Sequence, residues 1–142
     1  MQIDPATLDR RSAYHLMISC IIPRPIALVT SLSKEGITNL APFSFFNGVC
    51  SHPPIISIAV GSRKEGRKDT WINIEETGEF VVNVVVPEVM EAMMVGSREL
   101  PHNVSELELS KAPTLPSVKV KPPRLAGSPI QMECVKHQIV EV

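Results

Sequence analysis

Short runs of β-branched and aliphatic residues, bounded by turn residues, constrain the fold of this sequence more than any other feature. Three of these runs, at 26–30, 55–60 and 79–86, have the length of a strand rather than of a helix. The density of Ile and Val at 55–60 predicts a buried strand. Turn residues at 33–36 separate the first run from another extended stretch at 37–40, which predicts a hairpin.

Helical patterns lie beside and between these strands. The expected segments are a short helix that begins at Asp4 and Pro5 and ends before Pro23, a helix capped by Asp69 or Thr70 that runs through Trp71 to Thr77, a helix at 87–95 and a helical turn near 105–109. Gly78 directly follows the second segment and is typical of a residue that ends a helix. A proline-rich excursion at 100–129 is long enough to be functional or to cover something, and a last strand is expected at 130–142.

Together these elements favour a closed antiparallel sheet, a mainly β fold with a β-barrel and peripheral helices, over alternating βαβ units. The 142 residues, 44% of them apolar, are expected to form one domain over 1–142. The formal net charge of −1 gives no reason to expect a nucleic acid or an anionic membrane as partner. No stretch is long and apolar enough to cross a bilayer and no secretion signal is recognisable, so a soluble cytoplasmic protein is expected.

The cysteines and histidines do not follow the spacing of metal ligands. Cys20, Cys50 and Cys134 are odd in number and far apart, so we interpret them as small buried hydrophobes rather than as a disulfide framework or a zinc site. For the four histidines a surface or capping role is the simplest interpretation. His102 is the exception to watch, because the proline-rich excursion can bring it to a bound substrate.

Three segments carry groups that suit a phosphate or a flat ring. In the first, PRPIALVTS, Arg24 precedes a strand and Thr30 and Ser31 follow it, and a guanidinium with hydroxyls makes a phosphate cradle. The alternative is a β-turn whose Ser and Thr side chains are bonded internally. This segment taken alone favours that alternative.

The second segment, 39–48, places Phe43, Phe45 and Phe46 among small and polar residues. A flat ring needs apolar contacts for its faces and amide or backbone groups for its edge. A core cluster of phenylalanines with turn residues is an equally good interpretation.

The third segment, 62–70, carries four cations and two anions just before a helix N-terminus, where backbone N–H groups attract anions. A carboxylate at the cap competes with a phosphate, so we assign Asp69 a capping role and the phosphate contact to Ser62, Lys68 or Thr70. A solvated charged loop is the commonest fate of such a run and remains the alternative.

In this order the segments resemble one family. PRPIALVTS, NLAPFSFFNGVCSHPPIISIAV and KDTWINIEETGEFVVNVV are similar to the flavin reductase-like, FMN-binding split β-barrel proteins, and SPIQMECV is similar to their late strand. The resemblance is good from Pro23 to about Val86 and looser afterwards. It implies a Greek-key antiparallel split barrel that works as a homodimer, with the flavin near the dimer interface.

Carried over residue by residue, the resemblance implies a set of FMN contacts. Arg24, Thr30 and Ser31 are expected near the phosphate and ribityl chain, Ala41, Phe43, Ser44 and Asn47 along the flavin, and Ser62, Lys68, Asp69 and Thr70 at the phosphate end. Backbone N–H groups around 47–49 are candidates for stabilising the reduced flavin at its N1–C2 edge, where charge develops.

The activity implied is that of an NAD(P)H-dependent flavin reductase of the flavoredoxin or two-component monooxygenase reductase type. NADH or NADPH passes a hydride to N5 of FMN, and this chemistry resides on the flavin rather than on a catalytic side chain. Two alternatives stay open: an FMN-binding electron carrier or flavin donor to a partner monooxygenase, and a non-flavin split barrel that binds haem or another phosphate-bearing ring. Family members usually continue for further strands beyond the position of Val142, so we expect either a longer protein or a different completion of the barrel.

Overall fold

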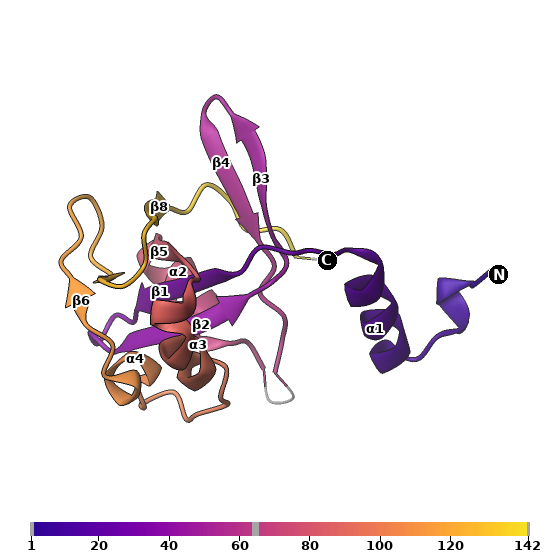
Figure 1. The fold of residues 1–142 in the computed structure, drawn as a ribbon, viewed down its shortest axis with the longest axis horizontal. Coiled ribbons are helices and arrows are strands. Elements are labelled where there is room, and N and C mark those ends of the chain that lie inside the picture. Colours follow the sequence, from indigo (N-terminus) through magenta and orange to yellow (C-terminus); the bar gives the residue numbers. More distant parts are fainter. Residues whose placement is uncertain (1, 64–65, 142) are drawn as a thin grey trace.

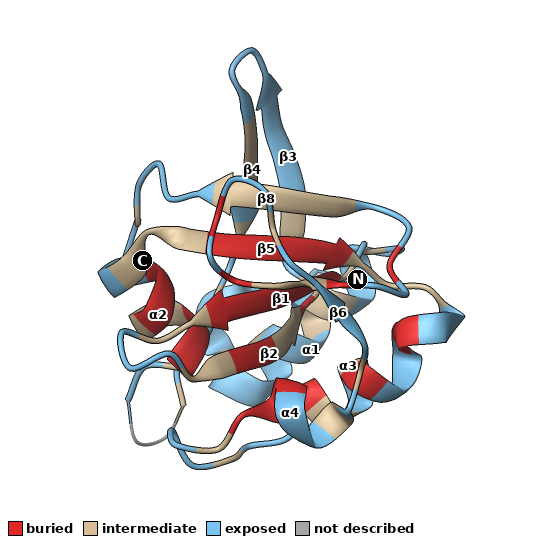
Figure 2. Cartoon of the chain, turned by 90° about the vertical axis from the view of Figure 1, so that its left-hand side faces the viewer, coloured by how far each residue is buried: buried red, intermediate tan, exposed pale blue. Residues whose placement is uncertain are grey.

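The computed structural model describes residues 2–63 and 66–141, and its centre is a four-stranded antiparallel sheet (Figure 1). In spatial order the strands are β2 (Thr38–Phe43), β1 (Ala27–Leu32), β5 (Glu79–Val84) and β8 (Gln131–Val135). Val29 of β1 stands opposite Ala41 of β2 on one side and Val82 of β5 on the other. The two inner strands, β1 and β5, are buried along most of their length (Figure 2).

Helices cover both faces of this sheet. The helical elements are η1 (Pro5–Thr7), α1 (Arg10–Cys20), α2 (Asp69–Thr77), η2 (Pro87–Val89), α3 (Met90–Gly96) and α4 (Glu106–Ser110). Because successive strand residues point to opposite faces, Val29 packs with Ile74 of α2, whereas Leu28 packs with Ala92 of α3 and Leu107 of α4.

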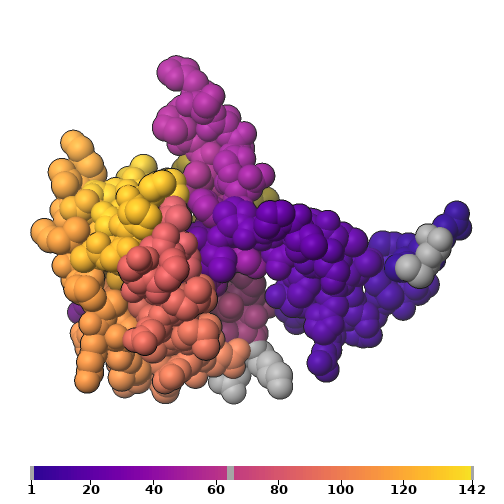
Figure 3. Space-filling model, viewed as in Figure 1, coloured from indigo at the N-terminus to yellow at the C-terminus, as the bar shows by residue number. Residues whose placement is uncertain are grey.

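Two features extend beyond this layered core. Strands β3 (Phe46–Ser51) and β4 (Pro54–Ile58) form a hairpin that rises away from the sheet, and α1 projects to one side as an arm (Figures 1 and 3). No residue of α1 is buried. A smaller pair, β6 (Thr114–Leu115) and β7 (Arg124–Leu125), orders part of the proline-rich excursion.

Most predicted elements are confirmed. The first hairpin turns at Gly36, whose φ of 89° suits glycine. Helix α2 ends at Thr77 as predicted, and Gly78 follows it with a φ of 75° and an N–H donated to the carbonyl of Ile74. The helix at 87–95 is divided into η2 and α3, and the turn near 105–109 is α4, with Ser105 as its N-cap.

Three predictions need correction. The strand expected to be buried at 55–60 lies in the protruding hairpin, where β4 is only half-buried or exposed. Asp4 caps only η1, and α1 begins at Arg10 after a separate cap, Asp9.

The third correction concerns the cysteines, which were expected to be buried. Cys20 and Cys50 are exposed, and only Cys134 is partly buried, where burial raises the pKa of its thiol to about 11.

The predicted fold class is confirmed in its antiparallel sheet with flanking helices. Helices and strands contain similar fractions of the residues, 28% and 29%. This is more helix than a mainly β fold implies. The strands of residues 2–63 and 66–141 form one open sheet of four strands and two pairs. Barrel closure and the Greek-key path therefore stay predictions.

Candidate functional site

The N-terminus of α2 lies at the centre of the candidate site. Lys68 occupies the N-cap position, and among the described residues no side chain caps the helix. The prediction that Asp69 caps it is wrong, because Asp69 is the first helical residue and its carboxylate points to other partners. The backbone N–H groups of the first turn are thus left for a ligand or for water.

The buried carboxylate of Asp69 is held between a cation and a histidine. Its Oδ2 lies 2.9 Å from Nη2 of Arg63, and its Oδ1 is in direct contact with Nδ1 of His102. The Arg63 guanidinium also donates to the carbonyl of Leu100. His102, which was expected near a substrate, lies beside α2. Its contact with Asp69 links the proline-rich segment 100–129 to the start of that helix.

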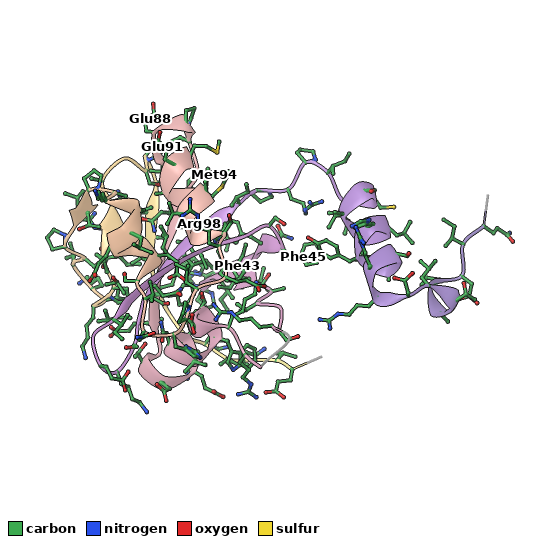
Figure 4. The ribbon with its side chains drawn as sticks, turned by 90° about the horizontal axis from the view of Figure 1, so that it is seen from below. Phe43, Phe45, Glu88, Glu91, Met94 and Arg98 are labelled. Atoms are coloured by element: carbon green, nitrogen blue, oxygen red, sulfur yellow. The ribbon has the colours of Figure 1, made fainter. Side chains whose placement is uncertain are left out.

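A hollow of about 150 Å³ opens in front of this helix terminus, and we call it the α2–α3 hollow. It contains four of the predicted site residues, Ala41, Lys68, Asp69 and Thr70. Its charged lining consists of Arg63, Lys68 and Arg98 with Asp69, Glu99 and Glu106. Figure 4 shows Arg98 just beyond α3. Three cations and three carboxylates thus line the hollow, beside a helix terminus whose N–H groups suit an anion.

Glycine at position 96 shapes this hollow. A Cβ at Gly96 would lie 2.7 Å from the backbone oxygen of Leu40, so only glycine lets α3 approach β2 this closely. The close approach brings Arg98 and Glu99, which follow α3, to the start of α2.

Behind the hollow lies a buried polar network. The amide of Asn39 lies 2.9 Å from Thr70 Oγ1, and Nδ2 of Asn73 donates to Ser31 Oγ at 3.0 Å. With the amide of Asn39 turned over, its nitrogen donates to Glu106 Oε2 at 3.2 Å and its oxygen accepts from Thr70. The network fixes the start of α2 against β1 and β2.

Glu106 is the most deeply buried carboxylate in this network, with 3% of the residue exposed. Burial raises the pKa of its carboxyl group, and the nearby charge of Asp69 raises it further. Hydrogen bonds from backbone groups, the Leu40 N–H among them, and the charge of Arg63 act in the opposite direction.

The aromatic residues lie beside the hollow rather than inside it. Lys68 Nζ stands 5.6 Å from the centroid of the buried Phe43 ring, which links the cation to the end of β2. Phe45 is turned toward α1, and its ring centroid lies 6.3 Å from that of Tyr14 (Figure 4). Ser44 Oγ accepts a long hydrogen bond of 3.5 Å from Nε of Arg24.

The sequence predicted that three segments converge on one phosphate. In the structure the hydroxyls of the first segment do not join the other two segments at such a site. Thr30 is fully buried, and its hydroxyl donates to the carbonyl of Pro123 on the α3–α4 side of the sheet. Ser31 is also fully buried, but it faces α2, and its oxygen accepts from Asn73. Neither side chain reaches a ligand surface, and we drop Thr30 from the site and keep Ser31 as a support for α2.

Three further predicted residues also lie outside the α2–α3 hollow. Arg24 donates to the carbonyls of Ile18 and Ile21, so its guanidinium holds the end of α1 rather than the predicted phosphate. Ser62 is exposed and accepts from Arg10 of the arm at 3.4 Å. Asn47 is exposed on the β3–β4 hairpin.

Sequence reasoning did not single out Arg98 and Glu106 at all, and named Asn39 and Arg63 only as members of segments. The positions of Arg98 and Glu106 follow from the packing of α3 and α4 on β2, for which local sequence carries no pattern. The one hint in the sequence was Ser105, a typical N-cap residue directly before Glu106. In the structure Ser105 caps α4 by accepting from the Glu108 N–H.

A second hollow, of about 250 Å³, borders the first at Asn39 and Asp69. It lies between the β1–β2 turn, α2 and the segment 102–104. In the described part of the chain no three His, Cys, Asp or Glu side chains are grouped to hold a metal ion. Nor does any described helix have the length and apolar character needed to span a membrane.

Comparison with known proteins gives a consistent family. The sequence model of the flavin reductase like domain matches residues 18–142. Nitrilotriacetate monooxygenase component B from Bacillus cereus is 40% identical, with a TM-score of 0.92 over 97% of this chain and 68% of that chain. The 2-nitrobenzoate 2-nitroreductase of Pseudomonas fluorescens is 36% identical, with a TM-score of 0.88 over 99% of this chain and 67% of that chain.

A more distant likeness concerns the fold alone. A split-barrel protein of Shewanella frigidimarina, assigned as a flavin reductase, is 20% identical, with a TM-score of 0.78 over 94% of this chain and 67% of that chain. This chain thus spans about two thirds of each of the three solved chains.

Proposed function

This chain belongs to the flavin reductase-like family, and from that premise we propose that it binds FMN and transfers a hydride to it from NADH or NADPH. The observation that carries the proposal is the start of α2, where Lys68 stands at a helix terminus with no side-chain cap among the described residues. Such a terminus, with its N–H groups and a lysine, suits a phosphate monoester.

The residues present fit the phosphate end of FMN. The carboxylate of Asp69 pairs with Arg63 and contacts His102, and it does not cap the helix. Lys68 and Arg98 remain to face an anion in the hollow, beside the N–H groups of α2. We therefore place the phosphate in the α2–α3 hollow.

The ring must lie outside that hollow, because ligand pockets for molecules of this size usually hold about 300–1,000 Å³ and the hollow holds about 150 Å³. We place the ring along the end of β2, where Ala41, Phe43 and Ser44 lead from the hollow toward the hairpin. Asn47 and the backbone at 47–49 contact it only if the hairpin or a second subunit closes over that end.

When bound, FMN would supply the chemistry of this reaction, as the acceptor of a hydride from a reduced nicotinamide. This chain's residues bind and orient the two rings and keep water from the space between them. The buried Phe43 ring positions Lys68 beside the end of β2, where that cation would face the phosphate end. No acid–base pair is required of the protein.

We propose that the working form is a homodimer. The α1 arm leaves Tyr14, Met17 and Ile22 largely exposed, next to Phe45 at the ring end of the site. An isolated helix of 11 residues is marginal in water, so α1 needs a surface to cover its apolar side. A second copy of this chain would supply that surface and close the ring end.

The similarity to a monooxygenase component B supports a partner monooxygenase that uses the reduced flavin. The alternative, an FMN-binding electron carrier, differs in turnover, because a carrier oxidises NADH or NADPH only slowly when FMN is added in excess.

The test is an absorbance spectrum, a titration with FMN and a steady-state assay of NADH and NADPH oxidation. Lys68→Ala is expected to weaken FMN binding about tenfold or more, as loss of a charge-assisted hydrogen bond does, and to leave riboflavin binding nearly unchanged. Lys119→Ala removes an exposed lysine elsewhere and serves as the matched control. A colourless protein that does not bind FMN would overturn the proposal in favour of a non-flavin ligand.

A further inference from the structure

The segment 99–104, which joins α3 to α4, lies along both hollows of the candidate site. Glu99 borders the α2–α3 hollow, and residues 102–104 border the second one. All of the segment lies outside helices and strands, and a backbone hydrogen bond from the Val104 N–H to the carbonyl of Pro101 closes a turn within it. Its position therefore depends on contacts with the neighbouring elements.

Arg63 and His102 hold this segment against the start of α2, and both act through the carboxylate of Asp69. Nη1 of Arg63 donates to the carbonyl oxygen of Leu100 at 3.3 Å, while Nη2 of the same guanidinium donates to Asp69 Oδ2 at 2.9 Å. Nδ1 of His102 contacts the other carboxylate oxygen, Oδ1. One carboxylate, with 9% of its side chain exposed, thus holds the segment both at Leu100 and at His102.

Arg98 comes directly before this segment and lines the α2–α3 hollow. Its backbone N–H donates to the carbonyl of Val95 at 3.1 Å, at the end of α3. Arg98 is exposed, and residues 2–63 and 66–141 offer its guanidinium no hydrogen bond or ion pair. Val95 on one side and Leu100 on the other therefore fix the backbone of Arg98, and with it the region that the guanidinium can reach.

The cations of the hollow thus divide into two kinds. The guanidinium of Arg63 is engaged by Asp69 and by the carbonyl of Leu100, so it holds the segment rather than an anion. The guanidinium of Arg98 is left for an anion. A long side chain loses rotamer freedom when it is ordered on a ligand, and a backbone that is already fixed lowers this cost.

We propose that Asp69 is a positioning residue for the flavin phosphate: through Arg63 and His102 it holds the segment 99–104 against α2, and so keeps Arg98 directed at the phosphate. The inference rests on the proposed function, since FMN phosphate in the α2–α3 hollow is its premise. The negative charge of Asp69 itself repels a phosphate, so its favourable contribution to binding is made through Arg98 and not by direct contact.

Positioning and simple charge predict opposite changes in the contribution of Arg98. If Asp69 acted only by its charge, Asp69→Asn would remove an attraction between Asp69 and Arg98 and leave the guanidinium at least as available to the phosphate. If Asp69 positions Arg98, the same replacement releases the segment 99–104, and Arg98 then contributes less to FMN binding.

The test is a double-mutant cycle on the FMN affinity of the full chain, measured by quenching of flavin fluorescence. Arg98→Ala is expected to weaken FMN binding about tenfold or more in the wild-type background, as loss of a charge-assisted hydrogen bond does. In the Asp69→Asn background the same change should weaken binding no more than about threefold, a coupling of the size found for residues in one network. Riboflavin, which has no phosphate, should bind nearly equally to all four proteins.

His102 gives a second route that leaves the charge of Asp69 in place. Its side chain is 63% exposed, so His102→Ala should leave the fold intact. We expect His102→Ala to reduce the effect of Arg98→Ala, and His102→Asn, which keeps an N–H donor at the position of Nδ1, to restore it. Asn103→Ala is the matched control, because Asn103 is an exposed residue of the same segment without a hydrogen bond to the described residues. It should leave the effect of Arg98→Ala at its wild-type size.

The outcomes separate the positioning role from FMN binding itself. An effect of Arg98→Ala that is as large in the Asp69→Asn and His102→Ala backgrounds as in wild type overturns the positioning role. So does an Arg98→Ala protein that binds FMN as tightly as wild type, or a loss that is equal for FMN and riboflavin. The His102→Ala cycle decides alone if Asp69→Asn does not fold. Absence of FMN binding by the wild-type chain would remove the premise and overturn the proposed function with it.

Discussion

The side chain of Glu106 makes folding stability depend on pH. Because burial raises its pKa in the folded state, the folded protein prefers the protonated form. This stabilisation is fully present below the pKa of the unfolded chain, about 4.3, and is lost as pH rises through the folded-state pKa. Glu106→Gln should therefore be more stable than wild type at neutral pH, by about 1.4 kcal/mol for every tenfold change in the acid dissociation constant on folding.

The measurement is urea unfolding of both proteins between pH 4 and pH 8. The advantage of Glu106→Gln should shrink toward zero at the acidic end, where the wild-type carboxyl is protonated as well. Glu108→Gln on the exposed side of the same helix is the control and should show little change. A difference between wild type and Glu106→Gln that is the same at every pH would contradict the expected raised pKa.

At this scale the sequence located Lys68 and Thr70, which line the α2–α3 hollow, because a helix start after a charged run has a local pattern. Their contact with a ligand stays a prediction. For Thr30 the pattern located the strand but did not show which face of the sheet the side chain points to. In the structure it points to the buried face that α3 and α4 cover. Glu106 had no local pattern at all, because its role depends on contacts with Asn39, 67 positions earlier in the chain.

At the level of elements, the approach of α3 to β2 shapes the candidate site. Gly96→Ala would place a methyl group 2.7 Å from the backbone oxygen of Leu40, and neither backbone can yield as a flexible side chain can. We expect a loss of about 1–3 kcal/mol in unfolding free energy, typical of overpacking, together with weaker FMN binding as the α2–α3 hollow changes shape. Thermal or urea unfolding and the FMN titration measure the two effects.

Gly61→Ala is the matched control, since a Cβ there has no neighbour within 4 Å and the backbone φ is not positive. It should change stability by only a few tenths of a kcal/mol. Equal stability of the Gly96→Ala and Gly61→Ala proteins would show that α3 can move away from β2 at little cost.

Elements with both a start and a stop pattern were predictable from sequence, as α2 with Gly78 shows. The β3–β4 hairpin was not, because Ile and Val at strand length predict a strand but not what covers it. Ile55, Ile56 and Ile58 are half-buried, and Ile56 and Ile58 pack against the core from the base of the hairpin strand.

At the scale of the whole molecule, the α1 arm and the hairpin project from the layered core (Figures 1 and 3) and carry exposed apolar side chains. Ile22 is 71% exposed, Tyr14 53% and Val49 61%, although other exposed apolar side chains, Met94 and Val118 among them, lie elsewhere. Several large apolar side chains gathered in this way mark an interaction surface. Because Phe45 lies against Tyr14, the same surface borders the proposed ring site.

This arrangement predicts that dimer formation and flavin binding depend on the same residues. Tyr14→Glu and Ile22→Glu should each raise the dimer dissociation constant by roughly tenfold to a hundredfold, since burying such a side chain is worth about 1.5–3 kcal/mol. Sedimentation equilibrium measures the mass, and FMN affinity should fall in parallel because the ring end stays open. Ser19→Glu adds the same charge to α1 without removing an apolar group and should remain dimeric. A monomeric wild-type chain with full FMN affinity would show that one copy completes the site, and the arm would then need a different partner.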